Sequence, residues 1–296
     1  MIPFKLPAPR GYSEEPIWNG AEFVIGGATL PILEYSENFE GWSDDLTLLH
    51  EEAAGENHPI DVASRMHAVA EIRKHLPAGN GVVMDIGCSS GFLLNDLVRE
   101  FPGCSTIGAD VVKEPLLKLH KKLGAIPLIR FDLLQCPLPA GSVDVIVMLN
   151  VFEHIDNDVL AMQQAFNLLK PGGTLVVEVP AGPSLFGPYD VELNHFRRYT
   201  RKELDSKLTS VGFDVVTRSH LGFLLFPMFA LVKLKDKIFA ANGSKTGVRG
   251  HASSTKDNSL MKIMMAVETR FFSRLSLPFG IRVLATAVKS ATSNVG

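Results

Sequence analysis

The feature that most constrains the fold is a regular alternation of short β-branched segments with helix-length segments in the middle of the chain. The apolar segments are residues 82–87, 105–110, 126–132, 143–149 and 173–179. Strands that alternate with helices form βαβ units, and successive units build a parallel sheet. These segments are apolar almost throughout, as expected for strands covered by helices on both faces. The sequence therefore predicts a doubly wound α/β fold.

The chain divides into four parts around this alternating region. Residues 1–60 form an N-terminal extension that could cover a bound ligand. Residues 61–220 form the core, which begins with a helix and ends in a sixth strand. Residues 221–278 are a helical insertion, and residues 279–296 hold a last strand and a tail. The predicted architecture is a Rossmann-like αβα sandwich with a mostly parallel, seven-stranded sheet whose last strand is antiparallel.

Composition limits the class of protein. Hydrophobic residues make up 46% and charged residues 21%, so neither wholesale disorder nor several membrane spans is expected. The formal net charge of -3 argues against a nucleic-acid partner. Three scattered cysteines form neither a disulfide framework nor a zinc motif, and no HExxH occurs, so no metal site is expected. The start of the chain does not resemble a signal peptide, and the protein is predicted to be cytoplasmic; its oligomeric state is not predicted.

The insertion begins with twelve uncharged residues, LGFLLFPMFALV (221–232), followed directly by Lys233 and Lys235. Twelve residues are too few to span a bilayer, which takes about 20 in a helix. This segment could be a lid over a hydrophobic ligand, a surface that rests on a membrane, or a packed helix. A second helix should return the chain to the fold through one apolar stripe, formed by Leu260, Met264, Val267, Phe271 and Leu275.

The strongest indication of a binding site is VVMDIGCSSGFLL, where a strand ends at Asp85 and the chain passes through Gly87 and Gly91 into a helix. A loop without side chains lets a ligand approach the backbone, and the amides at a helix start favour an anionic group. A dinucleotide-binding loop would read GxGxxG instead. The additional carboxylate before the first glycine suits a ligand with an amino group, a carboxylate and a ribose. Asp85 and Gly87 could alternatively form only a tight turn.

This segment resembles motif I of the class I S-adenosylmethionine-dependent methyltransferases, and later segments resemble the family's landmarks, in the same order, over roughly residues 60–220. The resemblance implies S-adenosylmethionine as cofactor, S-adenosylhomocysteine as product, and a small-molecule or lipid-like methyl acceptor. It also implies that Ile86, Cys88 and Val111 contact the cofactor. The sequence departs from the pattern at Cys88-Ser89-Ser90, where many members carry a further glycine.

The resemblance assigns roles to residues at the ends of the next three strands. Asp110 matches the acidic residue that accepts hydrogen bonds from both ribose hydroxyls. Asp132 resembles the residue that reads the adenine amino group, with Leu133 supplying a backbone contact. Asn150 and Val151 are similar to residues lining the methionine side of the pocket. Two structural alternatives remain open, because Asp110 could cap the next helix and Asp132 could be only a turn residue.

Methyl transfer is an in-line displacement that requires alignment and exclusion of water, without a metal or a covalent nucleophile. A hydroxyl acceptor also needs a base, and His154 is the candidate, with Glu153 to orient it. This pair slightly favours O-methylation, although it could instead anchor the following helix. His195, with Arg197 and Arg198, could face an anionic group of the acceptor, or the arginines could form a charged face that anchors the next helix.

Two other functions are compatible with the sequence. A nucleotide-dependent oxidoreductase could use a similar fold, but the GxGxxG pattern is missing. A non-catalytic descendant could keep the fold and the cofactor as a binding module. Peripheral membrane association also stays open, because the apolar segment of the insertion has a basic flank.

Overall fold

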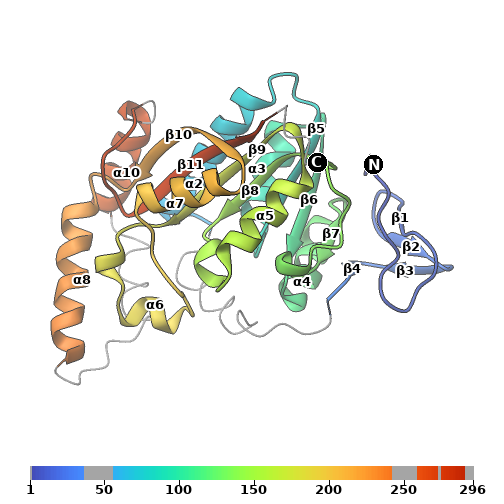
Figure 1. Cartoon of the computed structure of the whole chain (residues 1–296), viewed down its shortest axis with the longest axis horizontal. Coiled ribbons are helices and arrows are strands. Elements are labelled where there is room, and N and C mark those ends of the chain that lie inside the picture. Colours follow the sequence, from blue (N-terminus) through green and yellow to red (C-terminus); the bar gives the residue numbers. More distant parts are fainter. Residues whose placement is uncertain (1, 37–55, 242–258, 273–274, 291–296) are drawn as a thin grey trace.

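The computed structural model describes residues 2–36, 56–241, 259–272 and 275–290, and its centre is an eight-stranded sheet (Figure 1). Across the sheet the order is β10-β11-β9-β8-β5-β6-β7-β4. The strands are β4 (Leu33–Glu34), β5 (Gly81–Ile86), β6 (Cys104–Asp110), β7 (Leu128–Arg130), β8 (Val143–Leu149), β9 (Leu169–Pro180), β10 (Phe213–Leu221) and β11 (Arg282–Lys289). Their order and the flanking helices confirm the predicted αβα architecture.

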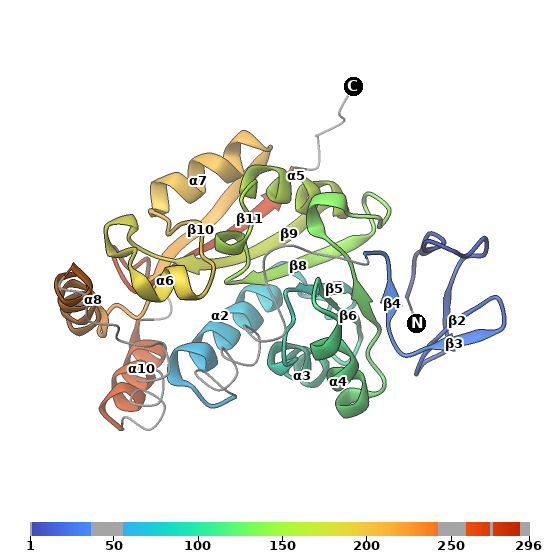
Figure 2. The same ribbon diagram turned by 90° about the horizontal axis from the view of Figure 1, so that it is seen from below.

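Helices cover both faces of this sheet (Figure 2). One face carries α2 (Pro59–His75), α3 (Phe92–Glu100) and α4 (Lys113–Leu123). The other carries α5 (Asp158–Leu168) and α7 (Arg201–Ser210). Because both faces are covered, neighbouring residues of one strand pack in opposite directions: Met84 joins one hydrophobic cluster, and Val83 joins the cluster on the other face. Because helices cover both faces of the sheet, its central strands are apolar almost throughout, as the sequence predicts.

The strands from β4 to β9 pair in parallel, whereas β11 runs antiparallel to both β9 and β10. All seven predicted strands are present, and the sheet has one strand more. The extra strand is β4, which comes from the N-terminal extension and places Leu33 opposite Ile129 of β7. A strand of two residues is too short to show a periodicity in the sequence.

Two predicted helix boundaries shift. The first core helix was expected from Asp61, but α2 begins at Pro59, since proline fits the first turn of a helix. Helix α5 follows Asn157, whose side chain accepts a hydrogen bond from the Leu160 amide. The residues PGG at 171–173 predict the end of this helix, but α5 already stops at Leu168, and those residues lie within β9.

Another part of the described N-terminal extension forms a small antiparallel sheet beside the β4 edge of the large sheet (Figures 1 and 2). Its strands are β1 (Ile17–Trp18), β2 (Phe23–Ile25) and β3 (Ala28–Leu30). Trp18 is buried against Phe23, with ring centroids 4.8 Å apart. Residues 37–55 of the extension, which include Trp42, lie outside the described residues. The expectation that residues 1–60 cover the cofactor therefore stays a prediction.

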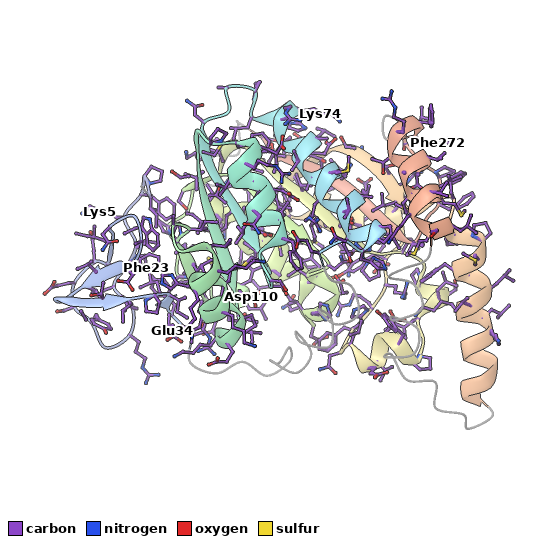
Figure 3. The ribbon with its side chains drawn as sticks, turned by 180° about the vertical axis from the view of Figure 1, so that it is seen from behind. Lys5, Phe23, Glu34, Lys74, Asp110 and Phe272 are labelled. Atoms are coloured by element: carbon purple, nitrogen blue, oxygen red, sulfur yellow. The ribbon has the colours of Figure 1, made fainter. Side chains whose placement is uncertain are left out.

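The insertion lies at the opposite end of the molecule from this small sheet, as the labelled Phe23 and Phe272 show in Figure 3. Its helices are α8 (Phe226–Ala241) and α10 (Ser259–Phe271). Most of the predicted packing stripe of α10 was wrong. Met261 and Met265 face the core and Met264 is partly buried against it, whereas Leu260, Val267, Phe271 and Leu275 are exposed. Helix α10 carries apolar side chains on two faces, and periodicity alone does not tell which face packs against the core.

Candidate active site

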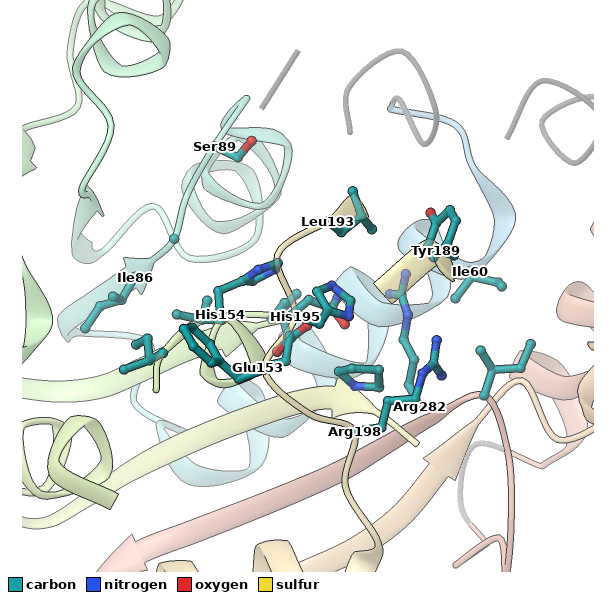
Figure 4. Close-up of a pocket in the computed structure, with 18 of the residues that line it drawn as sticks. Ile60, Ile86, Ser89, Glu153, His154, Tyr189, Leu193, His195, Arg198 and Arg282 are labelled. Atoms are coloured by element: carbon teal, nitrogen blue, oxygen red, sulfur yellow. The ribbon is translucent and has the colours of Figure 1, made fainter. Parts of the chain in front are cut away.

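A cavity of about 760 Å³ lies along the carboxyl ends of β5, β6 and β8, where ligands bind in doubly wound folds. Figure 4 shows Ile86 and Ser89 at one end, Tyr189, Arg198 and Arg282 at the other, and a cluster of Glu153, His154 and His195 between them. The cavity thus has a half beside the glycine-containing turn and a half beside the insertion.

The turn after β5 needs its glycines. Gly87 has φ +80°, and a Cβ there would lie 2.6 Å from Cγ2 of Val151. Gly91 has φ +72°, and a Cβ there would lie 2.3 Å from Cδ1 of Leu119. Ser89, in the segment that departs from the family pattern, has φ +43°. Ser89 therefore adopts the left-handed conformation that glycine tolerates best.

Asp110 lines the cavity at the end of β6 and is held by two backbone amides. The Ser89 amide donates to its Oδ2 and the Val112 amide to its Oδ1, both at 3.0 Å. Each carboxylate oxygen can accept more than one hydrogen bond, so Asp110 is fixed and still able to accept hydroxyl donors. Burial raises the pKa of its carboxyl above the usual value. Since α4 has no side-chain cap, the alternative role of Asp110 as a helix cap is not observed.

Three residues of the predicted cofactor site, Asp85, Cys88 and Gly91, do not line the cavity. Asp85 is buried beneath the loop, and burial, with the nearby charge of Asp110, raises its pKa to about 8. The amides of Gly87 and Cys88 both donate to the Ala109 carbonyl, at 2.8 and 3.1 Å. The two hydrogen bonds to Ala109 fix the shape of the turn, and Asp85 lies beneath it. The predicted residues that do line the cavity are Ile86, Gly87, Asp110, Val111, Asp132, Leu133, Asn150 and Val151.

Asp132 is the turn residue that its sequence context allowed, and it also lines the cavity, whereas its contact with adenine stays a prediction. Its Oδ1 accepts a hydrogen bond from the Leu134 amide at 2.9 Å and caps the short helix η1 (Leu133–Gln135). Its own amide donates to Oγ of Ser36, at the end of the described N-terminal extension, also at 2.9 Å. Asp132 is therefore a turn residue that also faces the cavity.

Asn150 ends β8 in a left-handed conformation, with φ +55°. Its side-chain amide donates to Oε1 of Glu178 at 3.1 Å, and its backbone amide donates to the Glu178 carbonyl at 2.8 Å. The buried Glu178 of β9 thus fixes the backbone where the chain leaves β8 and enters the second half of the cavity.

Glu153 and His154 belong to the short helix η2 (Phe152–His154), and His195 comes from the segment after α6 (Pro188–Glu192). The rings of His154 and His195 lie 4.6 Å apart, edge to face. The Phe196 amide donates to the Glu153 carbonyl at 2.8 Å and holds the two segments together. The fold therefore unites all three predicted catalytic residues, although about forty positions separate His195 from the other two.

His195 is oriented by Asp190, a residue that the sequence analysis missed. Nδ1 of His195 lies 3.0 Å from Oδ1 of the buried Asp190. Burial alone would raise the pKa of Asp190, but the His195 hydrogen bond and the charges of Arg198 and Lys233 hold it well below its usual range. An ionised carboxylate only accepts hydrogen bonds, so Nδ1 of His195 carries the proton. Burial lowers the pKa of His195, which leaves the ring neutral, with Nε2 able to accept a proton.

Glu153 does not orient His154, contrary to the expectation from the sequence. Its side chain is 1% exposed, and neither carboxyl oxygen has a hydrogen-bond partner among the described residues. Burial raises the pKa of Glu153 to about 8, so the carboxyl is mainly protonated at neutral pH. A buried polar group without a partner is costly, and Glu153 is therefore available to a ligand group that enters the cavity.

The two neighbouring arginines have different roles. Arg198 is buried at the cavity and donates from Nε to Asp190 at 2.7 Å. Arg197 does not line the cavity and pairs instead with Asp158 of α5 at 2.9 Å. The charged-face alternative therefore holds for Arg197, whereas Arg198 supports the position of Asp190.

The sequence predicts no metal site, and that remains a prediction. The fold brings one ligand atom from each of Glu153, His154 and His195 within 4.8 Å of one another. No motif in the sequence indicates this cluster, because these residues do not have a recognised metal-binding spacing. Three such side chains could together hold a metal ion, so the expected independence of a metal needs a direct measurement.

Residues 60–218 match a family model described as a methyltransferase domain. The chain is 30% identical over 157 residues to a probable S-adenosylmethionine-dependent methyltransferase of Mycolicibacterium smegmatis, a match that covers 51% of this chain and 59% of that protein. It is 25% identical over 162 residues to the malonyl-[acyl-carrier protein] O-methyltransferase of Halalkalibacterium halodurans, over 52% of this chain and 58% of that protein. The chain therefore matches less than two thirds of these relatives' lengths.

Solved structures show a similar fold at low sequence identity. A proposed sarcosine dimethylglycine methyltransferase from Galdieria sulphuraria aligns with a TM-score of 0.55 and 15% identity, over 84% of this chain and 99% of that chain. The [4+2]-cyclase SpnF aligns with a TM-score of 0.50 and 14% identity, over 75% of this chain and 80% of that chain. At these identities the similarity concerns the fold.

Proposed function

This chain belongs to the class I S-adenosylmethionine-dependent methyltransferases, and on that premise we propose that it methylates a hydroxyl group of a small, partly apolar acceptor. The observation that carries this proposal is the hydrogen bond between His195 and the buried Asp190. This bond leaves one neutral ring nitrogen able to take the hydroxyl proton, and an O-methyltransferase needs such a base.

The half of the cavity beside the glycine turn fits the cofactor. S-adenosylmethionine supplies a methyl group that its sulfonium already activates for displacement. Asp110, held by the Ser89 and Val112 amides, is suited to accept hydrogen bonds from both ribose hydroxyls. Asp132 and Leu133 would contact the adenine, and Asn150 and Val151 the methionine portion. A side chain at position 87 would collide with Val151 and close this half, so the glycine keeps it open.

The acid–base step is assigned to His195. Its Nε2 would accept the proton of the acceptor hydroxyl as the oxygen attacks the methyl group, and Asp190 would stabilise the resulting imidazolium. His154, the base predicted from the sequence, lies edge-on to the His195 ring and is a second candidate for contact with the acceptor. The protonated Glu153 would donate a hydrogen bond to a polar group of the acceptor.

The acceptor half has a mixed lining that favours an amphipathic molecule. Its apolar wall comes from the insertion and consists of Leu225, Met228, Phe229, Val232 and Met261. Its charged side chains are already paired: Arg198 with Asp190, and Arg282 with Asp61 at 2.6 Å. A strongly charged acceptor would compete with these pairs, whereas a neutral hydroxyl on an apolar body fits the lining. The relative from H. halodurans is named as an O-methyltransferase of a malonyl group, whose oxygens belong to a carboxylate, so it supports oxygen as the methylated atom, and the choice of a hydroxyl rests on the lining and on His195.

The test is transfer of a labelled methyl group from S-adenosylmethionine to matched acceptors that differ only in their nucleophile. Alcohols and phenols with an apolar body should be methylated, and the corresponding amines should react much more slowly. Preference for the amines would overturn the hydroxyl assignment. His195→Gln should abolish most of the turnover on alcohols while leaving cofactor affinity unchanged.

A non-methylating role is the alternative, because a cyclase also shares this fold. Tight binding of S-adenosylmethionine without methyl transfer to any member of the acceptor series would favour that role. The oxidoreductase alternative is disfavoured by the family match and predicts binding of a nicotinamide dinucleotide, which direct calorimetry would detect.

A further inference from the structure

Both helices of the insertion present large apolar side chains to solvent. On α10, Leu260, Ile263 and Phe271 are 56%, 61% and 70% exposed. On α8, Leu231 and Leu234 are 69% and 56% exposed. Isolated exposed apolar residues are common on protein surfaces, but a concentration of them on two adjoining elements indicates an interaction surface.

The exposed residues of α10 follow helical spacing. Positions 260, 263, 267 and 271 form one stripe, and the exposed Lys262 and Arg270 accompany it. The opposite side of α10 packs on the core through Met261 and Met265. The outward stripe is therefore not needed for folding of this helix. An apolar stripe accompanied by basic residues is typical of helices that lie in a membrane interface.

The charge of the insertion differs from that of the remaining chain. Residues 221–278 contain nine Lys and Arg against three Asp and Glu, whereas the other residues contain 20 against 29. A cationic segment on an otherwise acidic protein is attracted to an anionic surface and orients the molecule toward it. Charge thus favours an anionic partner at this end of the molecule and disfavours pairing of this end with the same end of a second copy.

The same helices form part of the cavity wall. Met228 and Val232 of α8 line the cavity and are also 45% and 39% exposed. Beside the start of α8, the rings of Phe223 and Phe226 lie 4.6 and 5.3 Å from that of Phe279, which is itself exposed. Figures 1 and 2 place α8 and α10 together at the end away from the small N-terminal sheet.

From these observations we infer that the α8–α10 end binds the surface of an anionic lipid bilayer. Apolar side chains would enter the interface, and the exposed Lys235, Lys262 and Arg270 would contact the lipid headgroups. The association is peripheral, because no helix within the described residues is long and apolar enough to cross a bilayer. Binding to the bilayer surface does not depend on which acceptor the protein methylates.

The test is co-sedimentation of the full chain with phosphatidylcholine vesicles, prepared with and without phosphatidylglycerol. The protein should pellet with the anionic vesicles, remain largely in solution with the zwitterionic ones, and dissociate as salt is raised. The triple variant Leu231→Ser/Ile263→Ser/Phe271→Ser should lower the partition coefficient by about tenfold or more, because three apolar side chains leave the interface. None of the three positions lines the cavity.

The matched control makes the same change at three exposed apolar positions far from these helices, Ile17→Ser/Val98→Ser/Val216→Ser. It should bind vesicles as the wild type does. Calorimetry with S-adenosylmethionine shows whether each variant is folded. Equal loss in both triple variants, or equal binding to both kinds of vesicle, would overturn the inference. Concentration-dependent self-association of the wild type that the first triple variant abolishes, without vesicle binding, would also overturn it and identify a second copy as the occupant.

Discussion

Nδ1 of His195 lies 3.0 Å from Oδ1 of Asp190, a carboxylate that is fully buried and also paired with Arg198 and Lys233. The pair joins a candidate base to a group that fixes its tautomer. Because two cations hold Asp190 ionised, the pair has one proton-accepting nitrogen, Nε2 of His195.

Removal of either member of this pair should slow the reaction. We expect His195→Gln to reduce kcat by about 10² to 10⁴, the usual contribution of a general base. Asp190→Asn should also reduce kcat, because the neutral amide no longer stabilises the imidazolium. The affinity for S-adenosylmethionine should stay unchanged in both variants. Steady-state kinetics over pH 5 to 9, with calorimetry as control, measures this, and an unaltered kcat in His195→Gln would refute the role of base.

Asp190→Asn should also destabilise the protein, because the substitution leaves Arg198 and Lys233 buried without a negative partner. The free energy of unfolding should fall by about 3–5 kcal/mol, as when one partner of a buried ion pair is removed. The pKa of Asp190 is lowered in the folded state, so its contribution to stability is present above the pKa of the unfolded chain and is lost in acid. The difference between wild type and variant should therefore shrink as the pH falls below about 4, the usual Asp value. Urea denaturation at several pH values shows whether it does.

Asp110→Ala should weaken the binding of S-adenosylmethionine and S-adenosylhomocysteine alike. The expected loss is about 1.5–3 kcal/mol, the range for hydrogen bonds to a charged group. Asp205→Ala, on the surface of α7, is the control and should bind as the wild type does. Isothermal titration calorimetry measures both, and equal affinities in the two variants would mean that the ribose lies elsewhere.

Glu153→Gln should become more stable relative to the wild type as the pH rises. The folded-state pKa of Glu153 is about 8, against an ordinary value of 4.5. Wild-type stability therefore declines between these two values, by at most about 1.4 kcal/mol per pH unit. The glutamine variant lacks this decline. Denaturation at pH 5, 6, 7 and 8 tests the trend, with the exposed Glu114→Gln as control; a gap that does not widen with pH would contradict it.

Gly87→Ala should impair the cofactor site more than an alanine at an unconstrained glycine. The new Cβ would lie 2.6 Å from Val151 in a left-handed backbone conformation, so the turn must shift. Gly141→Ala introduces the same residue at φ +64°, with nothing within 4 Å, and should cost only the backbone term of about 1–2 kcal/mol. Cofactor affinity reports the effect of the contact with Val151 on the site, and melting temperature reports the cost of alanine in the left-handed backbone conformation. Similar losses of affinity in both variants would show that contact with Val151 is unimportant.

The sequence by itself determined the sheet and its binding edge. The strands β5, β6, β8 and the second half of β9 are mostly apolar because both faces of the sheet are covered, and this pattern is local in the chain. The glycine turn at residues 87–91 and Asp110 are equally local, since each lies at the end of a strand whose position the alternation had already indicated. These features required no knowledge of distant contacts.

The tertiary structure alone decided which residues meet in the acceptor half of the cavity. Asp190 lies only five positions before His195, but no periodicity marks it as the partner of a base, and Lys233 arrives from the insertion. Glu153 loses its expected partnership with His154 because η2 directs its carboxyl into a buried space without donors. Likewise α10 has two apolar faces, and the choice between Met261 and Leu260 as the packed residue depends on where α2 and β10 lie. Pairing of charges and selection of a helix face depend on three-dimensional neighbours, which the order of residues along the chain does not specify.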